Sequence, residues 1–133
     1  MSSTRAAAAG AGAALAWAAV EPLDKRIFRL DYSDVALLGK LVTRTRWWPA
    51  AGLALHMANG AAFGLAYNRL RPRSALALAL AENFATFPLA IPFIRRHPAS
   101  GERGLAPIGS VRGLAQATAR HALFGVVLGR LAR

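Results

Sequence analysis

The segment PAAGLALHMANGAAFGLAY, which runs from Pro49 to Tyr67, decides the fold class of this chain. It contains no Lys, Arg, Asp or Glu, and its length is close to the roughly 20 apolar residues that a helix needs to cross a bilayer. Three more apolar segments cover approximately residues 6–22, 74–94 and 113–131. The sequence therefore predicts an all-α integral membrane four-helix bundle, a single membrane domain spanning residues 1–133.

Composition and charge favour the same class. Of the 133 residues, 55% are hydrophobic and 17% are charged, below the roughly 25% charged residues of average proteins. The net charge is +11, and the basic residues fall mainly between the apolar segments, which is typical of membrane loops that meet anionic headgroups. We therefore expect the lipid bilayer and anionic lipid headgroups as partners, and no nucleic acid. The chain has no cysteine, which excludes disulfides and thiolate metal sites.

The first apolar segment has two interpretations. It is short and rich in alanine, Arg5 precedes it, and Ala16-Trp17-Ala18 resembles a signal-peptide cleavage site. Three further spans follow it, however, and the repeat described below requires a first helix. We expect it to be retained as a membrane span.

Residues 31–43, between the first two spans, predict a shorter helix. Asp31 or Ser33 can cap its start. Its apolar residues recur at helical spacing, at Val35, Leu38 and Val42. We expect a short interfacial amphipathic helix, with an ordinary loop helix packed on the bundle as the alternative. Trp47 and Trp48 follow it and are expected in the interfacial layer, which indole rings prefer.

The second and fourth spans carry the same motif, H-x-x-x-G-x-x-x-G, at an offset of 65 residues. Its members are His56, Gly60 and Gly64 in one span and His121, Gly125 and Gly129 in the other. This match predicts two tandem helical hairpins with repeat halves 1–67 and 68–133, related by an axis near the membrane normal. Chance similarity in a chain rich in Gly and Ala is the alternative.

The glycines of the motif also predict where helices touch. A spacing of four places Gly52, Gly60 and Gly64 on one helix face, and Gly125 with Gly129 on the equivalent face. In lipid, small residues mark the faces where helices approach closely. We expect these faces at the bundle centre or against each other. Pro88 and Pro92 in the third span predict a bent or broken helix there.

Several polar side chains lie well inside the predicted spans. The predicted intramembrane polar cluster consists of His56, Asn59, Glu82, Asn83, Gln116, Arg120 and His121. Because a charge at the centre of a span costs about 2.5–3.5 kcal/mol, such groups usually face inward and find partners. The simplest interpretation is a Glu82–Arg120 ion pair that fixes helix register, surrounded by hydrogen bonds.

Two functional alternatives use the same residues. His56 and His121 lie at similar depth and could ligate a haem, or a divalent metal together with Glu82. Alternatively, the polar residues, the proline-containing helix and the repeat are features shared with transporters, in which Glu82 or a histidine would carry a proton. No cofactor is expected on the leading interpretation.

Enzyme motifs such as G-x-S-x-G and H-E-x-x-H are absent from the sequence, so catalytic residues are not assigned.

The acidic motifs Glu21-Pro22-Leu23-Asp24 and Asp31-Tyr32-Ser33-Asp34, followed by the first glycine motif, resemble small multi-span inner-membrane proteins of actinobacterial-type genomes. This resemblance implies a multi-pass bacterial inner-membrane protein and no particular activity. The four carboxylates could have a functional role at the membrane surface. Helix capping and the balancing of Lys25, Arg26 and Arg29 are the alternative explanation. The leading hypothesis is a structural or accessory membrane protein that associates with itself or with a membrane complex. An oligomeric transporter of protons or small solutes is the alternative.

The basic residues also predict an orientation. If all four spans cross, the termini share one side with six basic residues, namely Arg5, Arg69, Arg71, Arg73, Arg130 and Arg133. The two long loops hold ten, namely Lys25, Arg26, Arg29, Lys40, Arg44, Arg46, Arg95, Arg96, Arg103 and Arg112. The positive-inside rule then places the long loops in the cytoplasm and both termini outside.

Overall fold

The computed structural model describes residues 1–70 and 72–133; Arg71, one of the basic residues used for the orientation, lies outside them. This part of the chain forms five α-helices and no strand, which confirms the prediction of an all-α protein. The helices are α1 (Ser3–Phe28), α2 (Asp34–Val42), α3 (Trp48–Leu70), α4 (Ala75–Arg95) and α5 (Val111–Leu131). The four long helices cover the four predicted spans apart from Ser74, which is the N-cap of α4.

Two helices of the described chain, α1 and α4, are long and apolar enough to cross a membrane. Helix α3 has 23 residues and α5 has 21, so both are also long enough to cross a hydrocarbon core of about 30 Å. Polar side chains lower their mean hydropathy, for example Asn59 in α3 and Gln116 in α5. Length and composition therefore identify two candidate spans.

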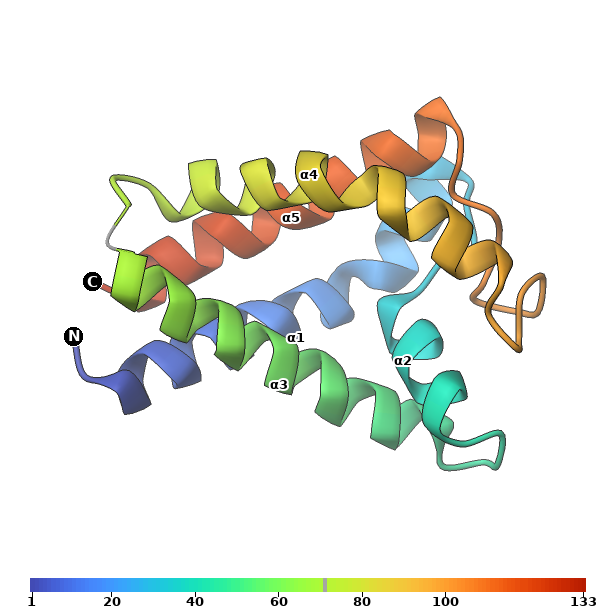
Figure 1. Cartoon of the computed structure of the whole chain (residues 1–133), viewed down its shortest axis with the longest axis horizontal. Coiled ribbons are helices and arrows are strands. Elements are labelled where there is room, and N and C mark those ends of the chain that lie inside the picture. The colour runs from blue at the N-terminus through green and yellow to red at the C-terminus, as the bar shows by residue number, and fades with distance from the viewer. Residues whose placement is uncertain (71) are drawn as a thin grey trace.

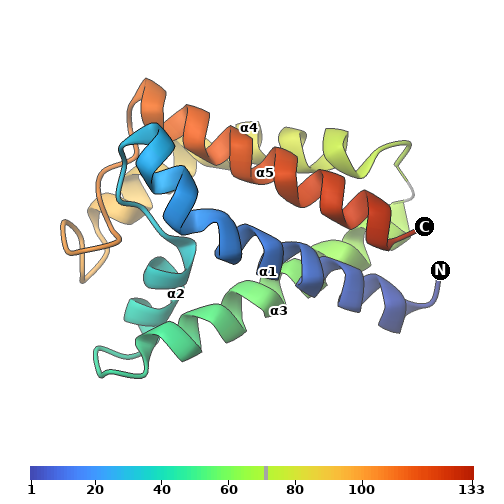
Figure 2. The same ribbon diagram turned by 180° about the vertical axis from the view of Figure 1, so that it is seen from behind.

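The long helices form two hairpins, α1 with α3 and α4 with α5, which are joined by the contact between α1 and α5. Helix α1 packs against α3 and also against α5, while α5 packs against α4 (Figure 1). Both termini lie at one end of the molecule, and α2 lies at the other (Figures 1 and 2). Helices α3 and α4 diverge toward the α2 end, and within the described residues they make no extended contact. Removal of α1 by a signal peptidase would therefore eliminate the helix that joins the two hairpins.

The glycine faces of α3 and α5 pack against the partner helix within each hairpin. Of the two arrangements expected for them, contact of the faces with each other is therefore wrong. A Cβ atom at Gly60 would lie 2.6 Å from the Cβ of Ala14 in α1, and one at Gly64 would collide with the carbonyl of Ala6. A Cβ atom at Gly125 would lie 2.6 Å from the Cα of Leu76 in α4. Glycine is needed at these positions because the partner backbone occupies the space of a side chain.

Helix α2 packs on α3, which is the alternative considered for residues 31–43. The Ser33 side chain caps the helix by accepting a hydrogen bond from the Ala36 N–H at 3.2 Å. A Cβ atom at Gly52 would lie 3.0 Å from the Gly39 nitrogen, so two glycines face each other at the crossing. The interfacial position of α2 stays a prediction.

The loop between α4 and α5 is fastened to α2. The His97 Nδ1 accepts a hydrogen bond from the Ala99 N–H at 2.9 Å, and its Nε2 donates to the Leu37 carbonyl at 2.9 Å. The Lys40 Nζ lies 3.2 Å from a Glu102 carboxylate oxygen, and Arg44 pairs with the same carboxylate. These contacts hold α2 and the loop together at the open end of the molecule.

Helix α4 continues through both prolines to Arg95, so it is bent and not broken. Figure 1 shows the change of direction in its C-terminal half. Each proline removes one backbone N–H from the helix, which permits a bend without ending the helix. The bend directs the end of α4 toward α2, and the loop that follows α4 is hydrogen-bonded to α2.

Candidate functional site

A cavity of about 310 Å³ lies between the two hairpins, where α3 and α4 diverge. All seven residues of the predicted intramembrane polar cluster line it: His56, Asn59, Glu82, Asn83, Gln116, Arg120 and His121. Its other walls are largely aromatic and apolar, and include Trp17, Tyr32, Phe63, Phe87 and Phe124. A concave space with apolar walls and a few polar groups is the usual form of a small-molecule site.

Arg120 lies at one end of this cavity and is held by Asp24, so the predicted Glu82–Arg120 pair is wrong. The Arg120 Nε lies 2.6 Å from Asp24 Oδ2, and its Nη2 lies 2.7 Å from Oδ1 of the same carboxylate. The Nη2 also donates to the Tyr32 carbonyl at 2.8 Å. The last turns of α1 bring Asp24 to the guanidinium, which is 2% exposed. This fork-to-fork geometry is the strongest form of Arg–carboxylate contact.

Two more carboxylates approach the same arginine. The Arg120 Nη1 lies 3.5 Å from Asp34 Oδ2 and 3.8 Å from Glu21 Oε1. Glu21 also accepts a hydrogen bond from the Ser33 hydroxyl at 2.6 Å. Glu21 and Asp24 are therefore buried side chains of the interior, and their position relative to the membrane surface stays a prediction.

Tyr32 closes this acidic end of the cavity. Its hydroxyl donates to Asp34 Oδ1 at 3.2 Å. Burial raises the pKa of Tyr32 well above its ordinary value, and the nearby Asp34 carboxylate raises it further. The phenol therefore stays protonated, and it remains a hydrogen-bond donor to Asp34.

Gln116 and Asn83 complete the network with hydrogen-bonded partners. The Gln116 amide donates to Asp24 Oδ1 and to the Leu30 carbonyl, both at 3.1 Å. The Asn83 amide donates to the Thr118 hydroxyl at 3.1 Å and joins α4 to α5. Both side chains are 1% exposed. Both amides thus have the hydrogen-bond partners that buried polar side chains usually have.

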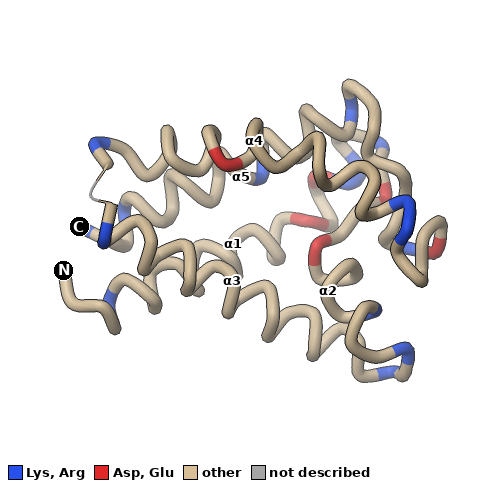
Figure 3. Tube along the Cα trace, viewed as in Figure 1, with Lys and Arg blue, Asp and Glu red and all other residues tan. Residues whose placement is uncertain are grey.

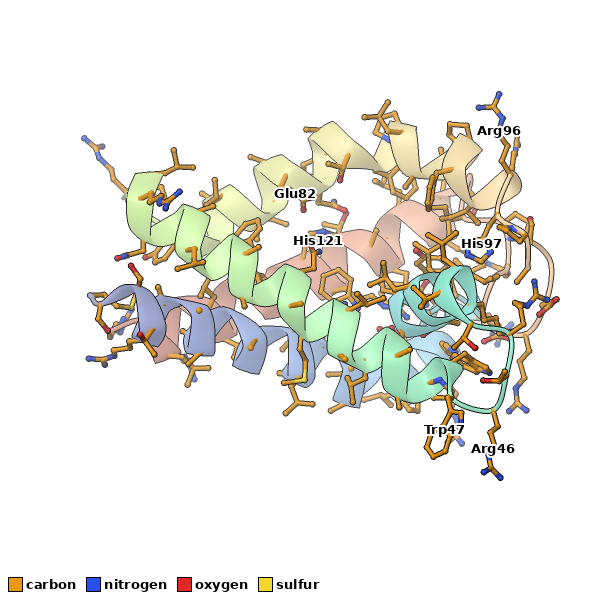
Figure 4. All side chains as sticks on the ribbon, turned by 60° about the horizontal axis from the view of Figure 1, so that its bottom comes forward. Arg46, Trp47, Glu82, Arg96, His97 and His121 are labelled. Carbon is orange, nitrogen blue, oxygen red and sulfur yellow. The ribbon has the colours of Figure 1, made fainter. Side chains whose placement is uncertain are left out.

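Glu82 pairs with His121 across the α4–α5 interface. The Glu82 Oε2 lies 2.9 Å from His121 Nε2, and the two side chains face each other in Figure 4. The Thr86 hydroxyl lies 3.1 Å from the other oxygen of the carboxylate. The His121 Nδ1 lies 2.7 Å from the Ala117 carbonyl. The pair lies in the cavity wall, and the Glu82 side chain is 38% exposed.

Two other polar atoms in the cavity wall have no hydrogen-bond partner among the described residues. They are Trp17 Nε1 and His56 Nε2, on side chains of residues that are 7% and 6% exposed. Leaving a buried donor or acceptor unpaired costs about 1–3 kcal/mol, so such atoms are rare in native proteins. Both atoms are buried behind the cavity surface, so they are unpaired polar groups of the packed interior.

The geometry does not fit a haem ligated by His56 and His121. Both rings pack edge-on against the same Trp17 indole, with centroid distances of 5.3 Å for His56 and 4.7 Å for His121. The indole thus occupies the space that a shared macrocycle would need. Both nitrogens of His121 also have partners, Glu82 and Ala117. Among the described residues, no group of three or more His, Cys, Asp or Glu side chains is arranged to hold a metal ion.

Acidic and basic residues occupy different parts of the molecule. Of the six acidic residues, Asp34 and Glu82 line the cavity, and Glu21 and Asp24 lie behind its wall against Arg120. Figure 3 shows these acidic positions toward the middle of the molecule, with most Lys and Arg at its two ends. A chain with a net charge of +11 thus surrounds an acidic cavity.

The two predicted interfacial tryptophans differ in their surroundings. Trp47 is 62% exposed, with the Arg46 guanidinium 5.2 Å from its ring centroid. Figure 4 shows both side chains pointing away from the bundle, as Arg96 does at the loop after α4. Trp48 is partly buried against α2, where the Lys40 Nζ lies 5.1 Å from its ring centroid. Trp47 therefore has the exposure that an interfacial anchor requires.

Sequence reasoning did not find Trp17, Thr86 or the partners of Arg120 as site residues. A signal was present for the carboxylates, because Glu21 and Asp24 are three residues apart and thus share a helix face. Trp17 also carried a signal, since an indole N–H in the middle of an apolar span needs a partner.

No protein-family model matches the chain, and no curated protein or solved structure was found to match it.

Proposed function

We propose that this chain is a multi-pass membrane protein that binds a small amphipathic organic molecule in the cavity between its hairpins and carries it as a small-solute transporter. In this proposal all four long helices cross the bacterial inner membrane. The divergence of α3 and α4 leaves the cavity accessible from the side, which suits a ligand that partitions into lipid.

The observation that carries this proposal is the cavity itself, whose wall combines aromatic rings with the Glu82–His121 pair. A purely structural interior would be closely packed with side chains and would not leave a space of about 310 Å³. A ligand with an apolar body and a hydrogen-bonding group would fill the cavity and bind the polar pair.

A structural or accessory role is the second candidate, and the Arg120–Asp24 pair supports it. That pair has no unpaired polar atom among the described residues and joins α5 to α1. The two candidate functions can both apply, because they concern different ends of the polar cluster. The Arg120 end holds the hairpins together, while the end with His56, Glu82 and His121 receives the ligand.

A cavity-filling variant tests the proposal. Thr86 lines the cavity, whereas its neighbour Ala85 does not, and both are exposed positions of α4. We expect wild type and Ala85→Trp, purified from bacterial membranes, to retain a common small molecule in mass spectrometry of the extract. Thr86→Trp is expected to lose it. An identical extract from all three proteins would contradict the proposal.

A further inference from the structure

The Glu82–His121 pair holds one proton in a defined arrangement. The Ala117 carbonyl can only accept, so His121 Nδ1, at 2.7 Å from it, carries a hydrogen. The contact between Nε2 and Glu82 then contains one further proton, either as imidazolium with carboxylate or as imidazole with carboxylic acid. Both forms are neutral overall. When that proton leaves, the pair carries one negative charge.

The surroundings of the pair favour a cation as the compensating charge. Besides the pair, four titratable or charged residues line the cavity: Tyr32 and Asp34 at α2, His56 on α3 and Arg120 on α5. Helix α1 contributes only the uncharged residues Ala14 and Trp17. Asp34 shares Arg120 with two more carboxylates, so this group as a whole has an excess of negative charge. An anionic ligand would therefore be repelled.

Aromatic rings provide the second requirement for an organic cation. The Trp17 indole contacts both histidine rings, and Phe63 and Phe124 pack edge to face at 5.1 Å in the same wall. Aromatic faces attract ammonium groups, most strongly where water is excluded.

We propose that the cavity binds an amphipathic organic cation, an amine or quaternary ammonium compound, in exchange for the proton of the Glu82–His121 pair. This inference rests on the proposed function and names its ligand class. One cation enters as one proton leaves, and return of the proton to the pair releases the cation. No bond other than the one to this proton is made or broken.

The test uses Trp17 as its reporter. The chain has three tryptophans, so Trp47→Phe together with Trp48→Phe leaves Trp17 alone in an otherwise complete chain. This protein is titrated with benzyltrimethylammonium and with neopentylbenzene, which has the same shape and no charge. We expect the cation to change Trp17 fluorescence at a concentration at least about tenfold lower than the neutral compound. A weakly buffered titration is expected to release one proton for each bound cation.

Variants at Glu82 separate exchange from simple binding. Glu82→Gln is expected to abolish proton release and to weaken cation binding at least about tenfold, whereas Glu102→Gln, on the loop that binds α2, leaves both unchanged. Helix content by circular dichroism checks each variant, and Glu82→Asp, which keeps the carboxylate, is expected to retain proton release.

Two results would overturn the inference. Equal binding of both compounds without proton release would reject cation exchange while leaving the cavity as a site for neutral molecules. Failure of both compounds to bind would also reject it, and the mass-spectrometric comparison of Thr86→Trp with Ala85→Trp then decides whether the proposed function falls with it.

Discussion

The guanidinium of Arg120 contacts polar groups from several parts of the chain. It lies on α5 and binds Asp24 on α1 and the Tyr32 carbonyl, with Asp34 of α2 at 3.5 Å. Burying a guanidinium is costly unless its hydrogen bonds are satisfied, and here Asp24 satisfies two of them. The arginine therefore depends on Asp24 for its stability in the interior.

Replacing Asp24 is expected to destabilise the fold strongly. Asp24→Asn leaves the charge of Arg120 buried without its principal counter-charge, and the loss of one partner of a buried ion pair costs about 3–5 kcal/mol. Asp31→Asn is the control, because its carboxylate pairs with Lys25 at 2.9 Å on the surface and such pairs contribute less than about 1 kcal/mol. Denaturant unfolding of both variants in detergent measures the difference. Equal stability of the two would show that Arg120 does not depend on Asp24.

Glu102 is expected to make the attachment of the loop after α4 sensitive to acid. The hydrogen bond from Lys40, together with the nearby Arg44, lowers the pKa of Glu102 below its ordinary value of 4.5. Because the folded pKa is the lower one, the stabilisation is present above pH 4.5 and is lost as the pH falls through the folded pKa. Carbon NMR of the Glu102 carboxyl should therefore give a midpoint below 4.5, and Lys40→Met should raise that midpoint. An unchanged midpoint in Lys40→Met would exclude Lys40 as the cause.

Glycine decides how closely the helices approach. In α1, a Cβ atom at Gly10 would lie 2.8 Å from the carbonyl carbon of Gly60 and 2.9 Å from the nitrogen of Gly64. These are backbone atoms of α3, which cannot move without separating the two helices. At Gly12, two residues along the same helix, the nearest atom is the flexible end of Leu131, 3.1 Å away.

Alanine at these two positions should therefore have opposite consequences. Gly10→Ala is expected to destabilise the protein by about 1–3 kcal/mol, because it forces α1 away from α3. Gly12→Ala is expected to be neutral or to stabilise by up to about 1 kcal/mol through better helix propensity. Thermal unfolding followed by circular dichroism compares them. A loss of stability in Gly12→Ala as large as in Gly10→Ala would show that helix contact is not the cause.

The number of membrane crossings determines on which side of the membrane the N-terminus and each loop lie. If four helices cross, Ser2 and Arg73 share one side and Ser100 lies on the other. If only α1 and α4 cross, Ser2 and Ser100 share a side and Arg73 lies opposite. The chain has no cysteine, and all three residues are exposed, so single cysteines can be introduced at each without background.

Labelling of these cysteines with an impermeant maleimide in right-side-out and inverted vesicles distinguishes the two topologies. We expect Ser2→Cys and Arg73→Cys to react in the same vesicles and Ser100→Cys to react only in the opposite ones. The positive-inside rule further predicts that Ser100→Cys reacts in inverted vesicles, which expose the cytoplasmic side. Reaction of Ser2→Cys together with Ser100→Cys, with Arg73→Cys reacting in the opposite vesicles, would contradict four crossings and support two.

Local pattern determined the helices of this protein. Apolar segments of nearly 20 residues, bounded by arginines and prolines, specify long helices whatever their neighbours are, because every backbone hydrogen bond of a helix lies within the segment. The predicted range 49–67 accordingly lies within α3, and 74–94 lies within α4 apart from Ser74, which is the N-cap of that helix. Polar residues inside such segments must face other helices, so the seven members of the polar cluster were predictable as a group.

Only the tertiary structure decided which of these residues meet. Glu82 and Arg120 lie at similar depth in adjacent helices, yet Glu82 contacts His121 and Arg120 contacts Asp24. Depth along a helix is set by residue count, whereas the direction of a side chain depends on how each helix is rotated about its axis. That rotation is set by close contacts between helices, such as Gly60 against Gly10 and Gly125 against Leu76. These contacts depend on the shapes of two distant segments together, which no single segment of sequence contains.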